Sequence, residues 1–146
     1  MIDVVAAALI GPDNKVLMHQ RPLAKMHGGL WEFPGGKLEP GETQLAALAR
    51  ELVEELDIAI DCDSALPVAF AQDPALGVQI TLWTLSTWQR APRCVEGEAI
   101  AWVALPELLD LAMPPLDVPL ANALIAAITG LPSGNDPHMS ATPTRP

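Results

Sequence analysis

Three glutamates lie close together in one short segment of the chain, shortly after a run of glycine and proline. The segment reads WEFPGGKLEPGETQLAALARELVEELD and holds Glu51, Glu54 and Glu55 near its end. Apolar residues at three- and four-residue steps predict a helix from Thr43 to about Leu56. Glu51 is then a surface neighbour of both other glutamates. We therefore expect the three carboxylates to converge on one strip, away from the apolar stripe.

Such a carboxylate strip is typical of a site for a hard divalent cation. Like charges at this spacing destabilise a helix by about 0.2–0.5 kcal/mol per pair, and Mg²⁺ or Mn²⁺ would relieve that repulsion. A solvated acidic face is the alternative. The preceding loop favours the metal site, because Pro34, Gly35 and Gly36 allow a sharp turn and a close approach to a ligand. A glycine carbonyl would then add a neutral oxygen ligand.

The overall charge restricts the partners. The chain has 146 residues, half of them hydrophobic, and 18 acidic against 8 basic residues give a net charge of -10. This balance argues against nucleic acid and against an anionic membrane surface. A phosphate-bearing substrate would need cations between it and the protein. Cys62 and Cys94 are too few for a disulfide scaffold and predict two reduced thiols of a cytosolic protein.

The remaining pattern predicts one α+β domain with a mixed β-sheet and helices on its faces. The apolar N-terminal run is too short for a signal peptide or a membrane span and predicts a buried first strand. GPDN between two strands predicts a hairpin. The expected strands are 2–10, 15–21, 30–33, 65–72, 77–88 and 98–105, with a loop over 34–42, a short helix over 106–111 and a second long helix over 116–129 that ends at Gly130. The domain is expected to cover residues 1–131, and a Pro/Ser/Thr-rich tail residues 132–146.

The spacing of the glycine loop and the acidic helix resembles the Nudix box, the signature of the Nudix hydrolase family. Gly36 is followed after five residues by Glu42, and after seven more by Arg50-Glu51-Leu52-Val53-Glu54-Glu55. The departure is Asp57, where the family has glycine. That glycine would end the helix in the left-handed conformation, which aspartate tolerates. We expect a small loss of stability from this departure and no loss of activity.

Residues 2–128 resemble more narrowly the MutT subgroup, the 8-oxo-dGTP diphosphatases, through GLWEFPGGKLEPGE, ITLWTLSTW, EGEAIAWVAL and MPPLDVPL. The resemblance implies the Nudix fold, a mixed sheet between helices, and Mg²⁺ as cofactor, with Mn²⁺ as a substitute. Water would attack the β-phosphorus and release pyrophosphate. The implied metal ligands are Gly36, Glu51, Glu54, Glu55 and Glu96.

The resemblance also implies catalytic roles. Glu51 and Glu54 act in catalysis, and Arg50 orients the ligands by pairing with Glu42 or Glu54. The general base is a box glutamate or an acid on a later loop. Glu96 matches that loop acid, as base or metal ligand, and a solvated loop carboxylate is the alternative.

The substrate contacts implied by the resemblance involve six further residues. Lys37 and Arg21 would contact phosphate, although Arg21 also fits an ordinary strand-end arginine. An apolar slot for the base would be lined by Phe33, Pro34 and Trp83, for which core packing is the alternative. Asp117 stands where several relatives read the base with asparagine, and it could instead cap the last helix. An ionised Asp117 only accepts hydrogen bonds and cannot donate to O6 of a guanine unless it is protonated.

The resemblance implies a Nudix nucleoside triphosphate pyrophosphohydrolase that acts on 8-oxo-dGTP and so protects DNA replication from oxidised precursors. A (d)CTP or 5-methyl-dCTP pyrophosphohydrolase is the first alternative. A nucleotide sensor without hydrolysis is the second, and the intact glutamate set argues against it. The expected partner is the nucleotide, with no nucleic acid and no membrane. We expect a cytoplasmic protein, and a monomer, although no sequence feature fixes the oligomeric state.

Overall fold

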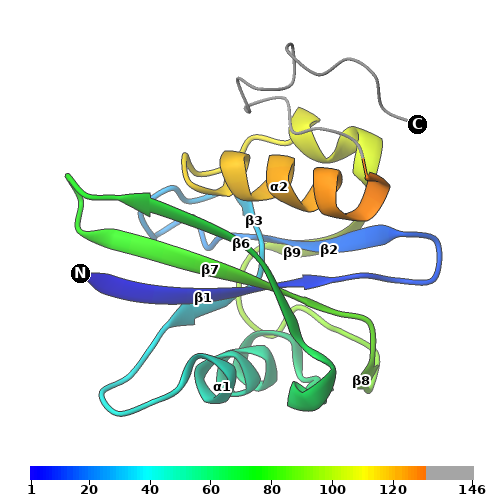
Figure 1. The fold of residues 1–146 in the computed structure, drawn as a ribbon, viewed down its shortest axis with the longest axis horizontal. Helices are drawn as coiled ribbons and strands as arrows, with labels where there is room; N and C mark the ends of the chain where they lie inside the picture. The colour runs from blue at the N-terminus through cyan, green and yellow to red at the C-terminus, as the bar shows by residue number, and fades with distance from the viewer. Residues whose placement is uncertain (131–146) are drawn as a thin grey trace.

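The computed structural model describes residues 1–130, so the predicted tail and its boundary lie outside the described residues. Strands fill the middle of the molecule, and the two long helices lie on opposite sides of them (Figure 1). This arrangement confirms the predicted α+β class. In chain order the elements are β1 Ile2–Leu9, β2 Lys15–Gln20, β3 Trp31–Glu32, β4 Gly35–Lys37, α1 Gln44–Leu56, β5 Ala59–Ile60, η1 Cys62–Ser64, β6 Leu66–Asp73, β7 Val78–Leu85, β8 Trp88–Gln89, β9 Ala99–Ala104, η2 Leu105–Asp110 and α2 Asp117–Thr129.

The strands form a four-stranded sheet in the order β4-β1-β7-β6, a three-stranded sheet in the order β3-β2-β9, and a pair β5-β8. β1 runs parallel to β7 along its whole length and antiparallel to β4. The larger sheet is therefore mixed, as the sequence predicts. β4 lies within the segment predicted as a loop, and its pairing with β1 fixes the glycine segment at one edge of the larger sheet.

The predicted hairpin between residues 2–10 and 15–21 is wrong. The GPDN turn does reverse the chain, with a bridge between Ile10 and Val16 and a hydrogen bond from Gly11 N–H to the Lys15 carbonyl. Beyond that point the two strands enter different sheets. The physical reason is that β4 and β7 already occupy both hydrogen-bonding edges of β1, so β2 pairs with β9 and β3 instead.

Two apolar layers hold the helices against the strands. Side chains alternate along β1, so that Val5 and Leu9 face the layer under α1 while Ala6 faces the layer under α2. β1 is thus buried on both faces, which confirms the predicted buried first strand. Leu48 and Leu52 of the predicted apolar stripe are fully buried in the α1 layer. The α2 layer takes Leu120, Ala121 and Leu124 from its helix.

The helix ends explain how the glutamate segment is held. The Thr43 side chain accepts a hydrogen bond from Ala46 N–H and caps α1. Asp57 ends the helix with φ 56° and ψ 40°, which confirms the predicted left-handed conformation. The residue before α2 is Leu116, and no side chain caps that helix. The alternative role of Asp117 as the cap of this helix is therefore wrong, because the residue lies in the first turn and its carboxylate accepts a hydrogen bond from Phe33 N–H.

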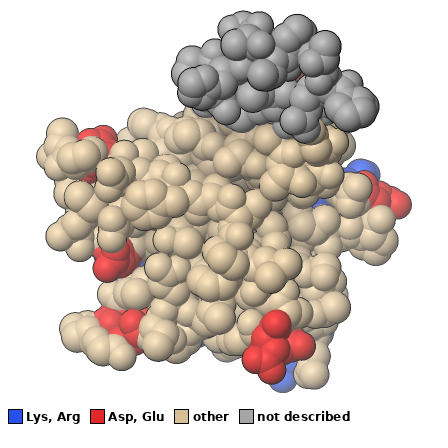
Figure 2. Space-filling model, viewed as in Figure 1, with Lys and Arg blue, Asp and Glu red and all other residues tan. Residues whose placement is uncertain are grey.

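Two expectations from composition hold over residues 1–130. Cys62 and Cys94 are free thiols. No helix in this range has the length and apolar character to cross a membrane. On the face seen in Figure 2, acidic side chains lie near the edges and the described residues form no basic patch.

Candidate active site

A cavity of about 540 Å³ gathers side chains from both sheets, from both long helices and from the loops between them. It receives most of the residues that the sequence singled out, together with several that it did not. The lining residues predicted from sequence are Arg21, Phe33, Gly36, Lys37, Glu51, Glu55, Glu96 and Asp117. The others are Val4, Val5, Ala6, His19, Pro22, Lys25, Met26, Glu32, Gly35 and Ile80.

Trp83 and Pro34, which were predicted to line the base slot, do not line this cavity. Successive residues of β7 face opposite sides of the sheet. Ile80 therefore faces the α2 layer and the cavity, whereas Trp83 packs in the α1 layer and donates its indole N–H to Gln44 Oε1 at 2.8 Å. Pro34 is buried, and its carbonyl accepts a hydrogen bond from Ala7 N–H. Leu82 of the same strand as Trp83 is a fully buried core residue.

At Gly35 and Gly36 other groups lie directly against the backbone, in the space that a side chain would occupy. A Cβ atom on Gly35 would overlap the Val5 carbonyl, and one on Gly36 would overlap the carboxylate of Glu51. The Gly35 N–H donates to Glu55 Oε1 at 3.0 Å. The glycine segment of β4 and the glutamates of α1 are therefore in direct contact, as the close approach inferred from the sequence requires.

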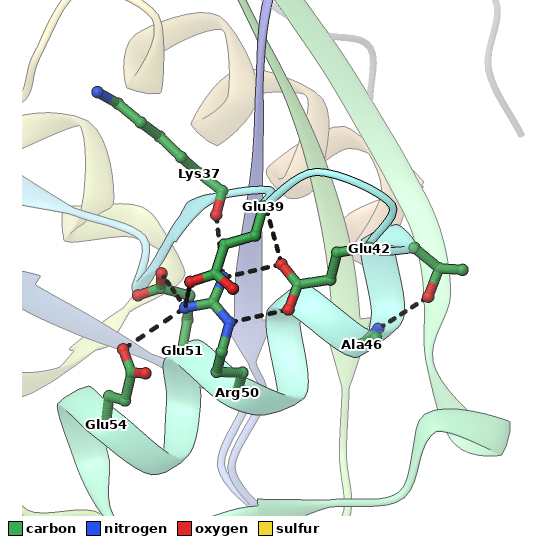
Figure 3. Close-up of polar contacts among 8 residues, drawn as sticks. Lys37, Glu39, Glu42, Ala46, Arg50, Glu51 and Glu54 are labelled. Carbon is green, nitrogen blue, oxygen red and sulfur yellow. Dashed lines mark hydrogen bonds and ion pairs between the residues drawn. The ribbon is translucent and has the colours of Figure 1, made fainter.

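Arg50 joins the carboxylates of the helix and the preceding loop (Figure 3). Its guanidinium makes two parallel bonds to Glu42, with Nε 2.8 Å from Oε2 and Nη2 2.9 Å from Oε1. This confirms the predicted pairing. The hydrogen bond from Arg50 lowers the pKa of Glu42 to about 2. Arg50 Nη1 also lies 2.9 Å from Glu51 and 3.6 Å from Glu54, so one arginine restrains three box carboxylates without lining the cavity.

Glu55 does not lie on the common surface strip that the sequence predicted for the three glutamates. Only 8% of it is exposed, because it is turned toward Gly35 and the cavity. Burial raises its pKa to about 7, and the charges of Glu32 and Glu51 add to this effect against His19 and the Gly35 N–H. Burial also raises the pKa of Glu51, with further contributions from Glu54 and Glu96. The Arg50 side chain opposes that rise.

These residues fit a divalent cation by their donor chemistry. Glu51 and Glu55 line the cavity beside Gly36, and their raised pKa values show that protein cations do not fully compensate their charges. A bound cation would supply that compensation through hard oxygen ligands. Within residues 1–130, no three acidic, histidine or cysteine side chains are already arranged as a metal site. Arg50 contacts the carboxylates of Glu51 and Glu54. To bind a metal ion, these two carboxylates would have to give up their contacts with Arg50.

The segment that carries Glu96 is attached to the end of α1 and to β2. Val95 N–H donates to the Glu55 carbonyl at 2.9 Å, and the Glu96 carbonyl lies 2.6 Å from His19 Nε2. His19 is 1% exposed, and its Nδ1 lies 3.5 Å from Glu32. Burial alone would lower the pKa of His19, but Glu32, the Glu96 carbonyl and Glu55 together raise it. The sequence signal for His19 is a polar residue inside the buried strand KVLMHQ.

A second group of polar residues surrounds Asp117. This carboxylate is 6% exposed and accepts a hydrogen bond from Phe33 N–H at 3.1 Å. Burial raises its pKa to about 7, and the Glu32 charge acts in the same direction, while the Phe33 N–H and Arg21 oppose it. Arg21 Nη1 lies 2.9 Å from Glu32, so Arg21 is not the free strand-end arginine considered from sequence. In the sequence, the feature that marks Glu32 as a candidate site residue is its position between two aromatic residues in WEF.

Comparison with known proteins agrees with this fold and this set of residues. The model of the NUDIX domain family matches residues 5–123. CTP pyrophosphohydrolase of Escherichia coli K12 is 38% identical over 135 residues, which cover 91% of this chain and 98% of that protein. Putative 8-oxo-dGTP diphosphatase 2 of Mycobacterium tuberculosis H37Rv is 38% identical over 116 residues, 78% of this chain and 82% of that one. A solved structure from a study of MutT from Aliivibrio salmonicida and Vibrio cholerae superposes with a TM-score of 0.77 at 28% identity, covering 86% of this chain and 98% of that one.

The chain therefore belongs to the Nudix domain family. Within that family it is a MutT-like hydrolase that acts on nucleotides. Nudix hydrolases generally need a divalent metal ion, which agrees with the donor set beside the cavity. The expectations that the sequence raised about fold, family and enzyme class are confirmed.

Proposed function

We propose that the protein hydrolyses 8-oxo-dGTP to 8-oxo-dGMP and pyrophosphate in this cavity. The observation that carries the proposal is the state of Asp117, a buried carboxyl group on the cavity wall whose pKa is raised to about 7. Near neutral pH this group exists in part as the acid, so it can donate as well as accept a hydrogen bond. The sequence alone left this donor role open.

A protonated Asp117 matches one edge of the oxidised base. Its O–H donates to O6, while the other oxygen, which already accepts from Phe33 N–H, accepts from N7–H of 8-oxoguanine through a second lone pair. Unoxidised guanine has no hydrogen on N7, so it would place an acceptor against an acceptor. A buried polar group without a partner costs about 1–3 kcal/mol. This mismatch supports a preference for 8-oxo-dGTP over dGTP.

The remaining residues take roles that their positions support. Gly36, Glu51, Glu54, Glu55 and Glu96 would hold the divalent cation, and Mg²⁺ suits these oxygen donors. When bound, the cation neutralises phosphate charge and lowers the pKa of coordinated water. Arg50, which is itself held by Glu42, restrains Glu51 and Glu54.

Three further assignments belong to the same proposal. Glu96 is the candidate for the base or a further ligand, because it lines the cavity on a separate loop. Lys37 and Arg21 line the cavity as candidate phosphate contacts. Phe33 supplies an apolar wall beside the Asp117 carboxyl.

CTP is the second candidate substrate, and one observation favours it. The Escherichia coli relative described as a CTP pyrophosphohydrolase aligns over 98% of its own length. Cytosine presents its N4 amine beside the N3 acceptor. A protonated Asp117 can accept from the amine and donate to N3, so the same carboxyl group suits both bases.

The deciding experiment measures kcat/KM with Mg²⁺ for 8-oxo-dGTP, dGTP, CTP, dCTP and 5-methyl-dCTP, and identifies the products of each reaction. The proposal expects 8-oxo-dGTP to give the highest kcat/KM, with dGTP at least tenfold lower, and pyrophosphate as a product. A higher kcat/KM for a cytosine nucleotide would transfer the assignment to the second candidate. Absence of hydrolysis with the whole panel would refute both.

A further inference from the structure

Asp57 contacts a part of the chain that a glycine at this position could not reach. It ends α1 in the left-handed conformation, which favours glycine and is the place of the glycine in the Nudix box. Its carboxylate is bound by two arginines, with Arg90 Nη1 3.0 Å from Oδ1 and Arg93 Nε 3.1 Å from Oδ2.

Both arginines belong to the segment 90–96, which connects β8 to β9 and ends with Glu96 in the cavity. The backbone of this segment also binds the end of α1. Arg93 N–H donates to the Leu56 carbonyl at 3.0 Å, and the N–H groups of Val95 and Glu96 donate to the Glu55 carbonyl at 2.9 and 3.4 Å. Carbonyls in the last turn of a helix have no partner within the helix. The segment supplies that partner.

The last turn of α1 therefore connects the box to segment 90–96. Glu54 and Glu55 of the box lie in this turn, and its carbonyls accept hydrogen bonds from the backbone of the segment. Asp57, which ends the helix, binds arginine side chains of the same segment. Glu96 and Glu51 line the same cavity, on the two sides of this junction. Displacing the segment would separate Glu96 from the box glutamates.

We propose that Asp57 is a positioning residue that binds Arg90 and Arg93 and so holds segment 90–96 with Glu96 beside the carboxylates of α1. The consequence for catalysis rests on the proposed role of Glu96, whereas the attachment of the segment does not. Aspartate in place of the glycine of the Nudix box thus adopts the left-handed conformation less easily, but it connects the helix to the segment that carries Glu96.

The test compares Asp57→Gly and Asp57→Asn with the native chain. Glycine restores the residue of the Nudix box and suits the left-handed conformation, and asparagine also tolerates it, so neither variant should lower Tm. Each removes the charge that binds both arginines. Amide hydrogen exchange in the metal-free protein should become at least threefold faster at Arg93 and Val95. With Mg²⁺ and the best substrate, kcat should fall by about three- to tenfold at nearly constant KM, because exposed ion pairs contribute modestly.

Two further variants make the test specific. Arg93→Ala should reproduce both effects, and Asp57→Asn combined with Arg93→Ala should be no worse than the more affected single variant, because the two changes remove the same interaction. Asp13→Asn removes one exposed negative charge in the turn after β1 and should change neither exchange nor kcat. Raising the salt concentration should reduce kcat of the native chain toward that of Asp57→Gly.

The outcomes distinguish the attachment of segment 90–96 by Asp57 from the effect of this attachment on catalysis. Unchanged exchange at Arg93 and Val95 in Asp57→Gly would overturn the attachment of the segment. Faster exchange with unchanged kcat would overturn the positioning role. Additive losses in the double variant would also overturn it. If the native chain hydrolyses none of the nucleotides, the proposed function fails, and the exchange measurement still decides whether Asp57 holds the segment.

Discussion

Replacing Asp117 with asparagine is expected to remove a pH dependence from both stability and activity toward 8-oxo-dGTP. The group is 6% exposed and its pKa is raised to about 7 by burial and by Glu32, against Arg21 and the Phe33 N–H. In the unfolded chain an aspartate titrates near a pKa of about 3.9. Between these values the folded chain binds more protons than the unfolded chain, so the free energy of unfolding falls as the pH rises. Asparagine keeps the shape and accepts the same Phe33 hydrogen bond without titrating.

The magnitude follows from the two pKa values. A difference between about 7 and about 3.9 corresponds to at most about 4 kcal/mol, at 1.36 kcal/mol per pKa unit. Relative to the native chain, Asp117→Asn should therefore be similar in stability at pH 4 and more stable by about 1–4 kcal/mol at pH 8. Urea unfolding from pH 4 to pH 8 measures this difference. Glu55 also has a pKa raised to about 7, and it contributes equally to both proteins, so the difference between them isolates Asp117.

Activity gives an independent reading of the same group. In the native chain, kcat/KM for 8-oxo-dGTP should fall as the pH rises through about 7, because Asp117 loses the proton that it donates to O6. In Asp117→Asn the amide donates to O6 at every pH, so this fall in kcat/KM should be absent. Asp117→Ala leaves the Phe33 N–H and the base edge without a partner, and the ratio of kcat/KM for 8-oxo-dGTP to that for dGTP should fall about tenfold or more.

A matched control and a clear contradiction complete this test. Asp13→Asn removes an exposed carboxylate and should keep the native pH profile. An identical pH dependence of stability in Asp117→Asn and the native chain would refute the buried, proton-holding carboxyl group. An unchanged substrate ratio in both Asp117 variants would remove the residue from the base-reading site.

Three further predictions concern the chemistry at the phosphates. EDTA should abolish hydrolysis and Mg²⁺ or Mn²⁺ should restore it, and Glu54→Gln should lower kcat by about 10²-fold or more; full activity in excess chelator would contradict the metal site. Gly36→Ala should reduce kcat by at least tenfold, because its Cβ would displace the Glu51 carboxylate; native kcat would show that this contact is dispensable. Hydrolysis in ¹⁸O water should place the label in pyrophosphate, and label in the monophosphate, read by mass spectrometry, would mean attack at the α-phosphorus.

The sequence by itself determined the features that depend on neighbouring residues. Leucines at three- and four-residue steps, the Thr43 cap and the left-handed Asp57 are set within one or two helical turns, so the pattern located α1 correctly. The spacing of Gly36 and the box glutamates likewise reflects local geometry. It indicated the family, which the match over residues 5–123 confirms.

Tertiary structure decided the features that depend on segments far apart in the chain. β1 lies between β4 and β7, and this pairing overrides the local hairpin signal of GPDN. The cavity receives Ile80 and excludes Trp83, because only the packed sheet defines which face of β7 meets α2. Burial and the approach of Phe33, 84 residues away, decide the protonation of Asp117.

The glutamate helix shows both contributions within one element. Its sequence placed Glu51, Glu54 and Glu55 within one turn, and the structure then separated their environments. Glu55 turns inward to Gly35, whereas Glu54 stays half-exposed beside Arg50. Side-chain spacing is a property of the helix alone, but desolvation depends on what packs against it, and burial dominates the pKa of Glu55. For the same reason, the binding of Asp57 by Arg90 and Arg93 became visible only once the segment 90–96 was folded against the helix.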